Sequence, residues 1–355
     1  MKEKNRFGDS GLQKFVSGAG MEITMNIMYT CDDNYVWLMG ISAVSLFEMN
    51  KDCDEINVYL LGNNISRENK DKLSQISKQY KRNIEVIEVP DLNIPESMCD
   101  KRWPKSAYTR LYAGELLPKE VDKVIYLDCD TIVNGSLLKL WKVDMGEKIV
   151  FGVLDCISDE YKKNIGLGKT EPYLNAGVLM FQVKLMRETD INQRINSFFD
   201  KYKDVMVYAD QDLMNGIFAQ RKGCIDIKYN VMSLFASYSY EEIMKLRRPR
   251  HYYSKKKIEN AKENPSIIHY TTCMLNVRPW FKNSEHPYGS IFLKYMEISP
   301  WNQKELSEAG FNSRKDKMLK ILERIPKIIA YNLIGFVHAY MKPFGYRMKN
   351  RLKRK

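Results

Sequence analysis

Two aspartates, Asp128 and Asp130, follow the apolar run 124–127 and could together bind a cation in this 355-residue chain. The run predicts a buried strand, and carboxylates at the carboxyl end of such a strand can lie in a cleft beyond the sheet. Alternate residues of an extended backbone point to one side, so both carboxylates could bind one hard divalent cation that grips a diphosphate. An acidic, solvated turn before Asn134 and Gly135 would explain the same residues.

Further polar segments interrupt apolar elements at 32–35, at 175–177, at 210–212 and at His269. Each has a structural explanation as a helix N-cap, a turn or a buried histidine. However, all of them fall where an open α/β sheet binds ligands. His269 could complete the ligands of the cation, and two carboxylates with one imidazole suit Mn²⁺ better than Ca²⁺. The ring of Tyr35 offers a face on which a base could stack.

The elements that must position these residues alternate between short apolar runs and helical patterns. Strands are expected at 26–30, 55–61, 84–89, 124–127, 149–154 and 176–181, and near Ile225 and Ile267. Helices are expected up to Phe47, from an N-cap at Ser66 to Tyr80, at 107–117 and from Gln211 to about Ala219. The alternation predicts an α/β fold, in which a mainly parallel sheet has helices on both faces and gains antiparallel strands in its second half.

The positive charge is concentrated at the end of the chain. The net charge is +12, but residues 314–355 hold thirteen Lys and Arg and two acidic residues, which leaves +1 for residues 1–313. A nearly neutral body argues against nucleic-acid binding. The seven cysteines form no CxxC pair, which argues against a zinc ribbon or a disulfide framework and fits a reducing compartment.

The last part of the chain combines an apolar segment with basic residues. Residues 328–341 are mostly apolar, but this segment is shorter than the ~20 residues that a spanning helix needs. Each basic residue that follows could add about 1 kcal/mol of attraction to an anionic lipid surface. We therefore predict a basic amphipathic helical tail on a membrane, with a solvated or nucleic-acid-binding charge run as the alternative. The expected parts are a loose leader at 1–24, one domain at 25–312 and the tail at 313–355; the leader lacks the apolar run of a secretory signal.

Several motifs follow one another between about Met25 and Trp280. They are Cys31-Asp32-Asp33-Asn34-Tyr35, Tyr108-Thr109-Arg110-Leu111, Tyr126-Leu127-Asp128-Cys129-Asp130, Asn175-Ala176-Gly177-Val178, Asp210-Gln211-Asp212-Leu213-Met214-Asn215-Gly216, His269-Tyr270 and Arg278-Pro279-Trp280. In this order and approximate spacing they resemble glycosyltransferase family 8, and within it the bacterial lipopolysaccharide and lipooligosaccharide galactosyl- and glucosyltransferases. The ordered set is far more specific than one Asp-x-Asp motif.

The resemblance implies a Rossmann-like GT-A fold and a retaining transfer from UDP-galactose or UDP-glucose that depends on Mn²⁺, with Mg²⁺ as the other possible ion. It implies that Asp128, Asp130 and His269 hold the metal. The nucleotide-sugar contacts that it implies are Cys31, Asp32, Asn34, Tyr35, Arg110, Asp128, Cys129 and Arg278. Around the transferred sugar and the acceptor hydroxyl it implies Asp155, Asn175, Asp210 and Gln211. The catalytic candidates at the cation-like anomeric centre are Gln211, Asp212 and Asp210.

The chain departs from the family pattern near its last motif. Arg278 stands where the family usually has a lysine, Thr272 replaces a glycine, and extra residues lie between them. We therefore expect a different loop over the phosphates.

Taken together, the sequence leads us to expect a cytoplasmic enzyme on the inner face of the plasma membrane. It would extend a lipid-linked glycan, such as a lipopolysaccharide or surface polysaccharide, through an α linkage. A front-face route and a covalent intermediate both stay open. The alternatives are a glucosyltransferase that acts on a glycoprotein or a teichoic-acid-type acceptor, and a basic-tailed protein that binds nucleic acid or a glycan without catalysis.

Overall fold

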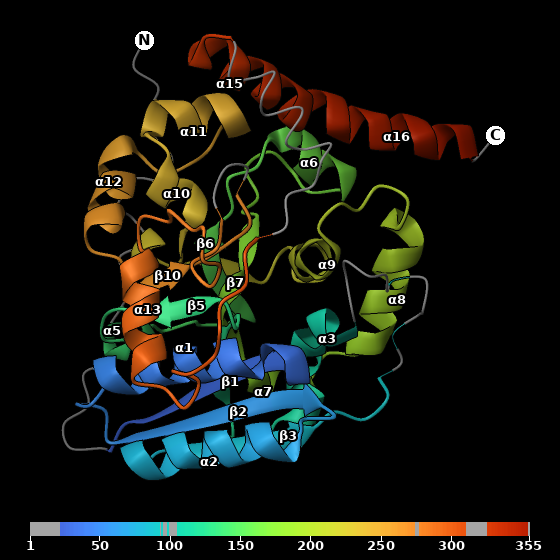
Figure 1. Ribbon diagram of the computed structural model, residues 1–355. Helices are drawn as coiled ribbons and strands as arrows, with labels where there is room; N and C mark the ends of the chain where they lie inside the picture. Colours follow the sequence, from blue (N-terminus) through green and yellow to red (C-terminus); the bar gives the residue numbers. More distant parts are fainter. Residues whose placement is uncertain are drawn as a thin grey trace.

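The central sheet of the computed structural model contains seven strands in the order β3-β2-β1-β4-β7-β6-β8 (Figure 1). The structure describes residues 22–92, 94, 98, 105–273, 277–309 and 325–353. The strands of this sheet are β1 (Thr24–Asp32), β2 (Glu55–Asn63), β3 (Asn83–Glu88), β4 (Lys123–Leu127), β6 (Val150–Leu154), β7 (Leu174–Gln182) and β8 (Lys222–Cys224). Strand β7 runs antiparallel to both its neighbours and every other pair is parallel. The predicted mixed, mainly parallel sheet is therefore confirmed.

Neighbouring residues of one strand enter different hydrophobic clusters, one on each face of the sheet. Ile27 of β1 packs in the cluster that contains α1 and α2, whereas Met28 packs with α4, α7, α8 and α9. These helices are α1 (Val36–Met49), α2 (Arg67–Tyr80), α4 (Ala113–Leu116), α7 (Val183–Arg187), α8 (Ile191–Tyr202) and α9 (Ala209–Ile217). Because side chains alternate along a strand, a strand covered on both faces is apolar at nearly every position. The predicted helices on both faces are confirmed.

Two predicted helices illustrate how local chemistry decides a helix. The side chain of Ser66 accepts a hydrogen bond from Asn69 N (3.3 Å) and caps α2, as predicted. The helix expected at 107–117 is instead broken into α3 (Lys105–Tyr108), the 3₁₀ segment η3 (Thr109–Tyr112) and α4. At the break, Arg110 Nε donates to Ala107 O (3.1 Å), so a side chain supplies a donor to that carbonyl.

A second, three-stranded sheet packs beside the carboxyl end of β4. It contains β5 (Thr131–Val133), β10 (Ile267–His269) and β9 (Val231–Met232), with β10 in the middle. Strand β10 is antiparallel to β5, which places His269 opposite Thr131.

The prediction that Asp128 and Asp130 share one extended strand is wrong. Residues 129 and 130 form a turn between β4 and β5. Both the backbone N (3.2 Å) and Oγ1 (2.8 Å) of Thr131 donate to Asp128 O, and these two bonds close the turn. The chain therefore passes from one sheet to the other at the two aspartates.

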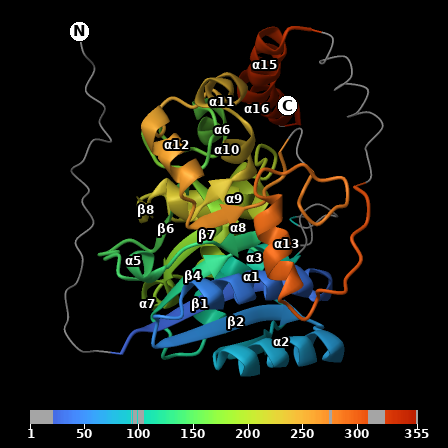
Figure 2. The ribbon, with the colours of Figure 1, turned by 60° about the vertical axis from the view of Figure 1, so that its left-hand side comes forward.

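The remaining helices lie mostly in the second half of the chain. They are η1 (Asp33–Tyr35), α5 (Leu138–Trp141), α6 (Asp159–Asn164), η4 (Ile227–Tyr229), α10 (Ser233–Ser237), α11 (Tyr240–Arg247), α12 (Lys255–Glu263) and α13 (Gly289–Glu297). The tail follows as α15 (Lys327–Phe336), the π-helical segment η5 (Val337–Met341) and α16 (Lys342–Lys353). It lies beside α6 and α11, at the end of the molecule opposite α2 (Figures 1 and 2). None of the helices within the described ranges is both long and apolar enough to span a membrane.

The tail helix continues through Pro343, just beyond the end of the apolar segment 328–341. A proline has no N–H to donate to the carbonyl four residues earlier, which here belongs to Ala339. Ser158 Oγ donates to that carbonyl instead (2.7 Å), and the wider π-helical turn lies directly before the proline. A side chain from the body of the protein thus allows the helix to pass the proline.

Candidate functional site

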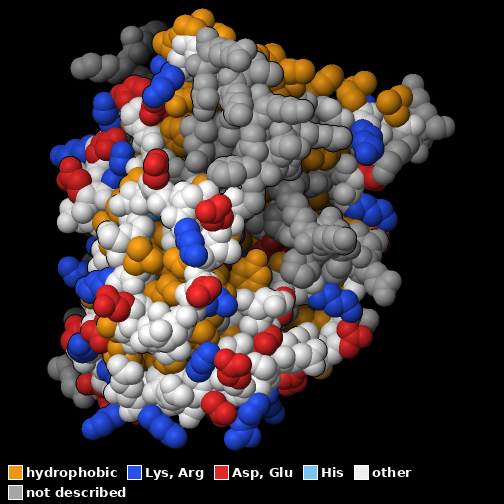
Figure 3. All heavy atoms as spheres, viewed as in Figure 1, with side chains coloured by type: hydrophobic (Ala, Val, Ile, Leu, Met, Phe, Trp, Pro, Cys, Tyr) orange, Lys and Arg blue, Asp and Glu red, His pale blue; other side chains and the backbone are white. Residues whose placement is uncertain are grey.

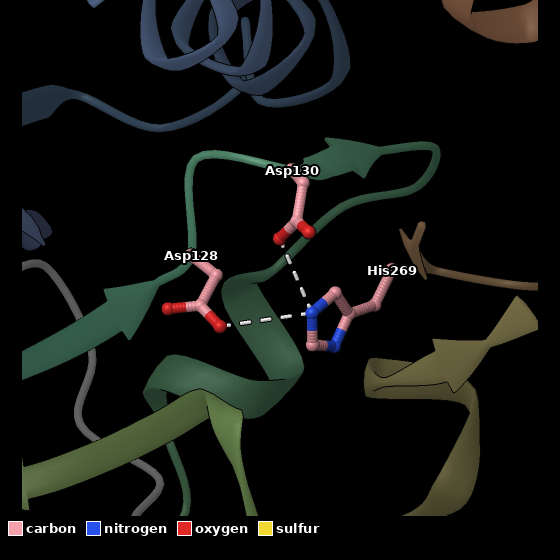
Figure 4. Close-up of side chains that lie close together, drawn as sticks. All are labelled: Asp128, Asp130 and His269. Carbon is pink, nitrogen blue, oxygen red and sulfur yellow. Dashed lines mark ion pairs between the residues drawn. The ribbon is translucent and has the colours of Figure 1, made fainter. Parts of the chain in front are cut away.

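The side chains of Asp128, Asp130 and His269 converge where the two sheets meet (Figure 4). One ligand atom from each of the three lies within 4.8 Å of the others. His269 Nε2 is 3.2 Å from Asp130 Oδ1 and 3.6 Å from Asp128 Oδ2. Ligand atoms that share an octahedral ion at about 2.1 Å lie about 3 Å apart, so these spacings fit a divalent cation. Two carboxylates and one imidazole form a suitable ligand set for such an ion.

In Asp128 and Asp130, one carboxylate oxygen lies next to an arginine and the other oxygen faces His269. Asp128 Oδ1 accepts from Tyr126 OH (2.5 Å) and lies 3.0 Å from Arg110 NH1. Asp130 Oδ2 accepts from Arg278 NH2 (3.2 Å). Outer contacts of this kind orient metal ligands. Arg278 thus reaches the site despite the altered spacing of its motif, and residues 274–276 of the expected loop lie outside the described residues.

The histidine is oriented by an asparagine pair and a glycine. His269 Nδ1 lies 2.9 Å from Asn230 Oδ1, and a ring that donates there offers Nε2 to a metal. Asn230 Nδ2 in turn donates to Asn175 Oδ1 (2.8 Å). The ring lies against Gly177, where an added Cβ would come within 2.0 Å of His269 Cε1. The segment 175–177 therefore leaves room for the imidazole and fixes its direction.

The protonation of the histidine is coupled to that of its partners. Burial raises the pKa of the Asp130 carboxyl, but His269 and Arg278 outweigh burial and hold this pKa below its usual value. Burial lowers the pKa of His269, and the two aspartates outweigh it and raise this pKa above 6.5. A bound cation would replace the proton that these groups share.

Arg110 connects the aspartates to helix α9. Its guanidinium lies 3.3 Å from Asp210 Oδ2 and stacks on the ring of Tyr126 at 4.3 Å. Burial raises the pKa of Asp210 to about 6; Arg110 opposes the shift and Asp128 adds to it. The arginine therefore balances two carboxylates at once.

Gln211 forms a network with two other predicted site residues. Its Oε1 accepts from Ala176 N (3.0 Å) and Asn175 Nδ2 (3.2 Å), and its Nε2 donates to Asp155 Oδ2 (2.8 Å). These contacts bring Asp155, Asn175 and Gln211 together next to the segment that holds the histidine.

The comparisons with known proteins agree with this geometry. Residues 26–284 match the family model described as Glycosyl transferase family 8. The chain belongs to glycosyltransferase family 8. It is similar to General stress protein A of Bacillus subtilis (28% identical, 78% of this chain, 95% of that protein) and to lipopolysaccharide 1,3-galactosyltransferase of Salmonella typhimurium (22%, 78% and 81%). It is also similar to lipopolysaccharide 1,2-glucosyltransferase of Escherichia coli (24%, 78% and 79%).

A solved structure supports the same fold. The galactosyltransferase LgtC, in complex with donor and acceptor sugar analogues, matches with a TM-score of 0.67 and 27% identity over 79% of this chain and 100% of that chain. The protein therefore has a GT-A-like fold and is a sugar-transferring enzyme of family 8.

In this family 8 enzyme, Asp212 has different contacts from its neighbours. Its Oδ1 accepts from Tyr173 OH (2.6 Å), and its Oδ2 accepts from Val207 N (2.7 Å) and Tyr208 N (2.8 Å). Oδ2 therefore holds the two residues that precede α9, and Oδ1 ties α9 to Tyr173. The first residue of α9, the non-glycine Ala209, has φ +34°, a left-handed conformation that costs an L-residue about 1–2 kcal/mol.

The predicted nucleotide-binding segment lies after β1. Asp32 Oδ1 accepts from Asn34 N (3.0 Å) and caps η1, while the ring of Tyr35 is 48% exposed and free to stack. Cys31 and Cys129 are buried, free thiols.

The structure also assigns contacts to three residues that the sequence left without a role. Asp33 Oδ1 accepts from Ser66 N (2.8 Å) and Asn69 Nδ2 (2.7 Å), which fastens η1 to α2. Tyr126 contacts Asp128 and Asn230 contacts His269, two members of the candidate metal cluster. Asn230 is fully buried between apolar neighbours. An amide within an apolar run of the sequence needs a hydrogen-bond partner, and this is the signal by which the sequence could have pointed to Asn230.

We predict that Gly177→Ala weakens divalent-cation binding at least about tenfold, because the new methyl group displaces the His269 ring. Titration with Mn²⁺, followed by electron paramagnetic resonance of the free ion, measures the affinity. Gly135→Ala is the matched control, since its Cβ would meet Ser266 only at 3.5 Å. Equal affinity in wild type and Gly177→Ala would contradict the role of the histidine as a ligand.

We also predict that Mn²⁺ affinity increases as pH rises through the raised pKa of His269, because the ion must displace a proton. Without metal, the stability of the fold changes with pH in the opposite direction. The proton stabilises the fold fully below pH 6.5, and this stabilisation is lost as pH rises through the folded-state pKa. Titrations and urea unfolding from about pH 5.5 to about pH 8.5 test both slopes. His269→Gln should flatten each of them; persistence of both slopes in this variant would assign them to another group.

Proposed function

We propose that this enzyme transfers galactose or glucose from its UDP form to a hydroxyl of a membrane-linked glycan, with retention and an α linkage. The observation that carries the proposal is the Asp128, Asp130 and His269 cluster beside the Gln211 network. The names of the relatives, lipopolysaccharide galactosyl- and glucosyltransferases, support the hexose and the glycan acceptor.

The diphosphate end of the donor would lie at the aspartates. Asp128, Asp130 and His269 would hold Mn²⁺, which suits a mixed oxygen and nitrogen ligand set better than Mg²⁺ does. When bound, the ion would supply Lewis-acid stabilisation of the diphosphate charge. Arg278, 3.2 Å from Asp130, would stabilise the leaving phosphate as its charge grows.

The nucleoside would lie along the segment after β1. Tyr35 would stack on the uracil ring, and Asp32 and Asn34 would bind the uridine. The buried thiol of Cys129, which interacts with Cys31, would lie beside the donor, and Arg110, 3.0 Å from Asp128 Oδ1, would contact it as well.

The transferred hexose would lie against Asp155, Asn175, Asp210 and Gln211. A cation-like anomeric centre is stabilised by a nearby amide or carboxylate oxygen, and Gln211 and Asp210 are our candidates. The pKa of Asp210, about 6, suits a group that receives the proton of the acceptor hydroxyl near neutral pH. A structure of an active-site glutamine-to-glutamate mutant of LgtC is similar to this chain (TM-score 0.64, 27% identity), in keeping with a glutamine at the reaction centre.

The tail would place the enzyme on the inner, anionic face of the plasma membrane. Its outer side carries a row of exposed apolar side chains, visible along the upper edge of Figure 3. They are Ile328, Ile329, Leu333, Phe336, Val337, Met341, Phe344, Met348 and Leu352. Small residues, Ala330, Gly335 and Ala339, lie on the buried side. Exposed basic residues between the apolar ones, such as Lys342 and Arg351, complement anionic lipid.

We predict that Asp130→Asn abolishes the Mn²⁺-dependent hydrolysis of UDP-galactose and UDP-glucose, because the cation loses a charged ligand. Release of UDP from a panel of UDP-sugars measures turnover and identifies the donor. Asp144→Asn, an exposed carboxylate outside the site, is the control for the loss of one charge. Undiminished turnover in Asp130→Asn would exclude the metal role, and a panel without turnover would exclude UDP-hexose as the donor.

We further predict that Leu333→Asp with Phe344→Asp releases the full chain from vesicles that contain anionic lipid, since both side chains are more than half exposed on the outer side of the tail. Co-sedimentation with vesicles measures binding. Leu293→Asp changes a similarly exposed side chain on α13 and should leave binding intact. Unchanged binding of the double variant would show that the tail does not dock.

A further inference from the structure

The first turn of helix α9 carries Asp210 and Gln211, and its backbone is strained. Ala209, the residue directly before Asp210, has φ +34° although it is not a glycine. Such a conformation persists only where surrounding contacts impose it. The contacts of Asp212 and Tyr173 restrain the turn from the inside. A second set of contacts restrains it from the outside, and these come from the tail.

The outer contacts begin at Tyr208, which lies immediately before the strained residue. The Tyr208 ring packs on Tyr161 of α6 at 5.5 Å, and the Tyr161 ring packs on His338 of the tail at 5.4 Å. Tyr208 OH also lies 3.5 Å from His338 Nε2. The tyrosine that precedes the turn is therefore enclosed by α6 and the tail histidine.

His338 is itself fixed by an arginine of the catalytic domain. Its Nε2 lies 2.6 Å from Arg247 NH1, which donates to it. Burial, with the charges of Arg247 and Lys342, lowers the pKa of His338 to about 3, so the ring is neutral and can accept. Arg247 therefore holds the histidine beside Tyr208.

The tail helix is held closely against the body along its length. Arg347 donates to Asn164 Oδ1 (2.6 Å) and to Glu160 Oε2 (2.5 Å) on α6. Gly335 lies so near α11 that a Cβ there would come within 1.8 Å of Lys245 O. Ser158 holds the carbonyl of Ala339, one residue after the histidine. These contacts fix the position of His338 relative to the active-site turn.

We propose that His338 is a positioning residue for sugar transfer: the tail, besides its outer docking side, holds the strained turn that presents Asp210 and Gln211. This inference rests on the proposed function for its kinetic consequence, but the restraint of the turn stands on the contacts alone. The histidine acts through Tyr208, which directly precedes the first turn of α9, and Arg247 holds the histidine in place. The inner side of the tail is thus part of the catalytic unit.

The test uses the full chain without vesicles. His338→Leu removes the acceptor for Arg247 and should lower kcat for hydrolysis of the accepted UDP-hexose about tenfold, with KM and Mn²⁺ affinity unchanged. His338→Gln keeps an acceptor oxygen and should restore most of kcat. Leu293→Ala, at an exposed side chain on α13 outside the tail, should leave kcat at the wild-type value.

A second measurement requires no substrate and separates the two proposals. Hydrogen exchange of the amides of residues 207–212 should be faster in His338→Leu than in wild type and in His338→Gln. If exchange is faster in His338→Leu but the wild-type protein hydrolyses no UDP-hexose, the restraint of the turn is supported. Only the proposed function is then rejected. Unchanged exchange and kcat in His338→Leu would overturn the inference. Equal losses of kcat and of melting temperature in the Leu and Gln variants would also overturn it, because they indicate only general destabilisation.

Discussion

The structure depends on the neutralisation of three negative charges, the carboxylates of Asp128, Asp130 and Asp210, which lie close together and are largely buried. Like charges this close repel one another strongly when water is excluded, so each carboxylate needs a cation. Arg110 lies between Asp128 and Asp210, Arg278 lies on Asp130, and the histidine faces the first two aspartates. A divalent cation in the candidate site would complete this balance and, as proposed, would bind the negatively charged diphosphate of the donor.

The balance requires segments that lie far apart in the chain. The turn after β4 supplies two aspartates, η3 supplies Arg110, and β10 supplies His269 opposite β5. The antiparallel strand β7 passes between them with a glycine at the point where the imidazole must lie. Its other residues hold Gln211 through backbone and side-chain bonds. One strand therefore sets the distance between the cation site and the sugar site.

The tail has two sides with different physical requirements. Its inner side is built from small residues that allow close packing on α11, and from polar residues that pair with α6. Its outer side exposes large apolar residues beside basic ones, a pattern that favours a lipid surface over water. The packing of the tail on α6 and α11 therefore connects the proposed docking surface to the catalytic domain.

The sequence by itself determined the alternation of strands and helices, the N-cap at Ser66, and the ordered motifs that identify family 8, because these depend on local periodicity and on residue types. Only the tertiary structure decided the turn at 129–130, the second sheet and the helix through Pro343. Short strands such as β5 acquire their identity from a partner that lies more than a hundred residues away. The proline is tolerated because Ser158, distant in the chain, satisfies a carbonyl. Contacts between distant segments leave no periodic signal in a single sequence, and the direction of a side chain such as Asn230 is set by those contacts.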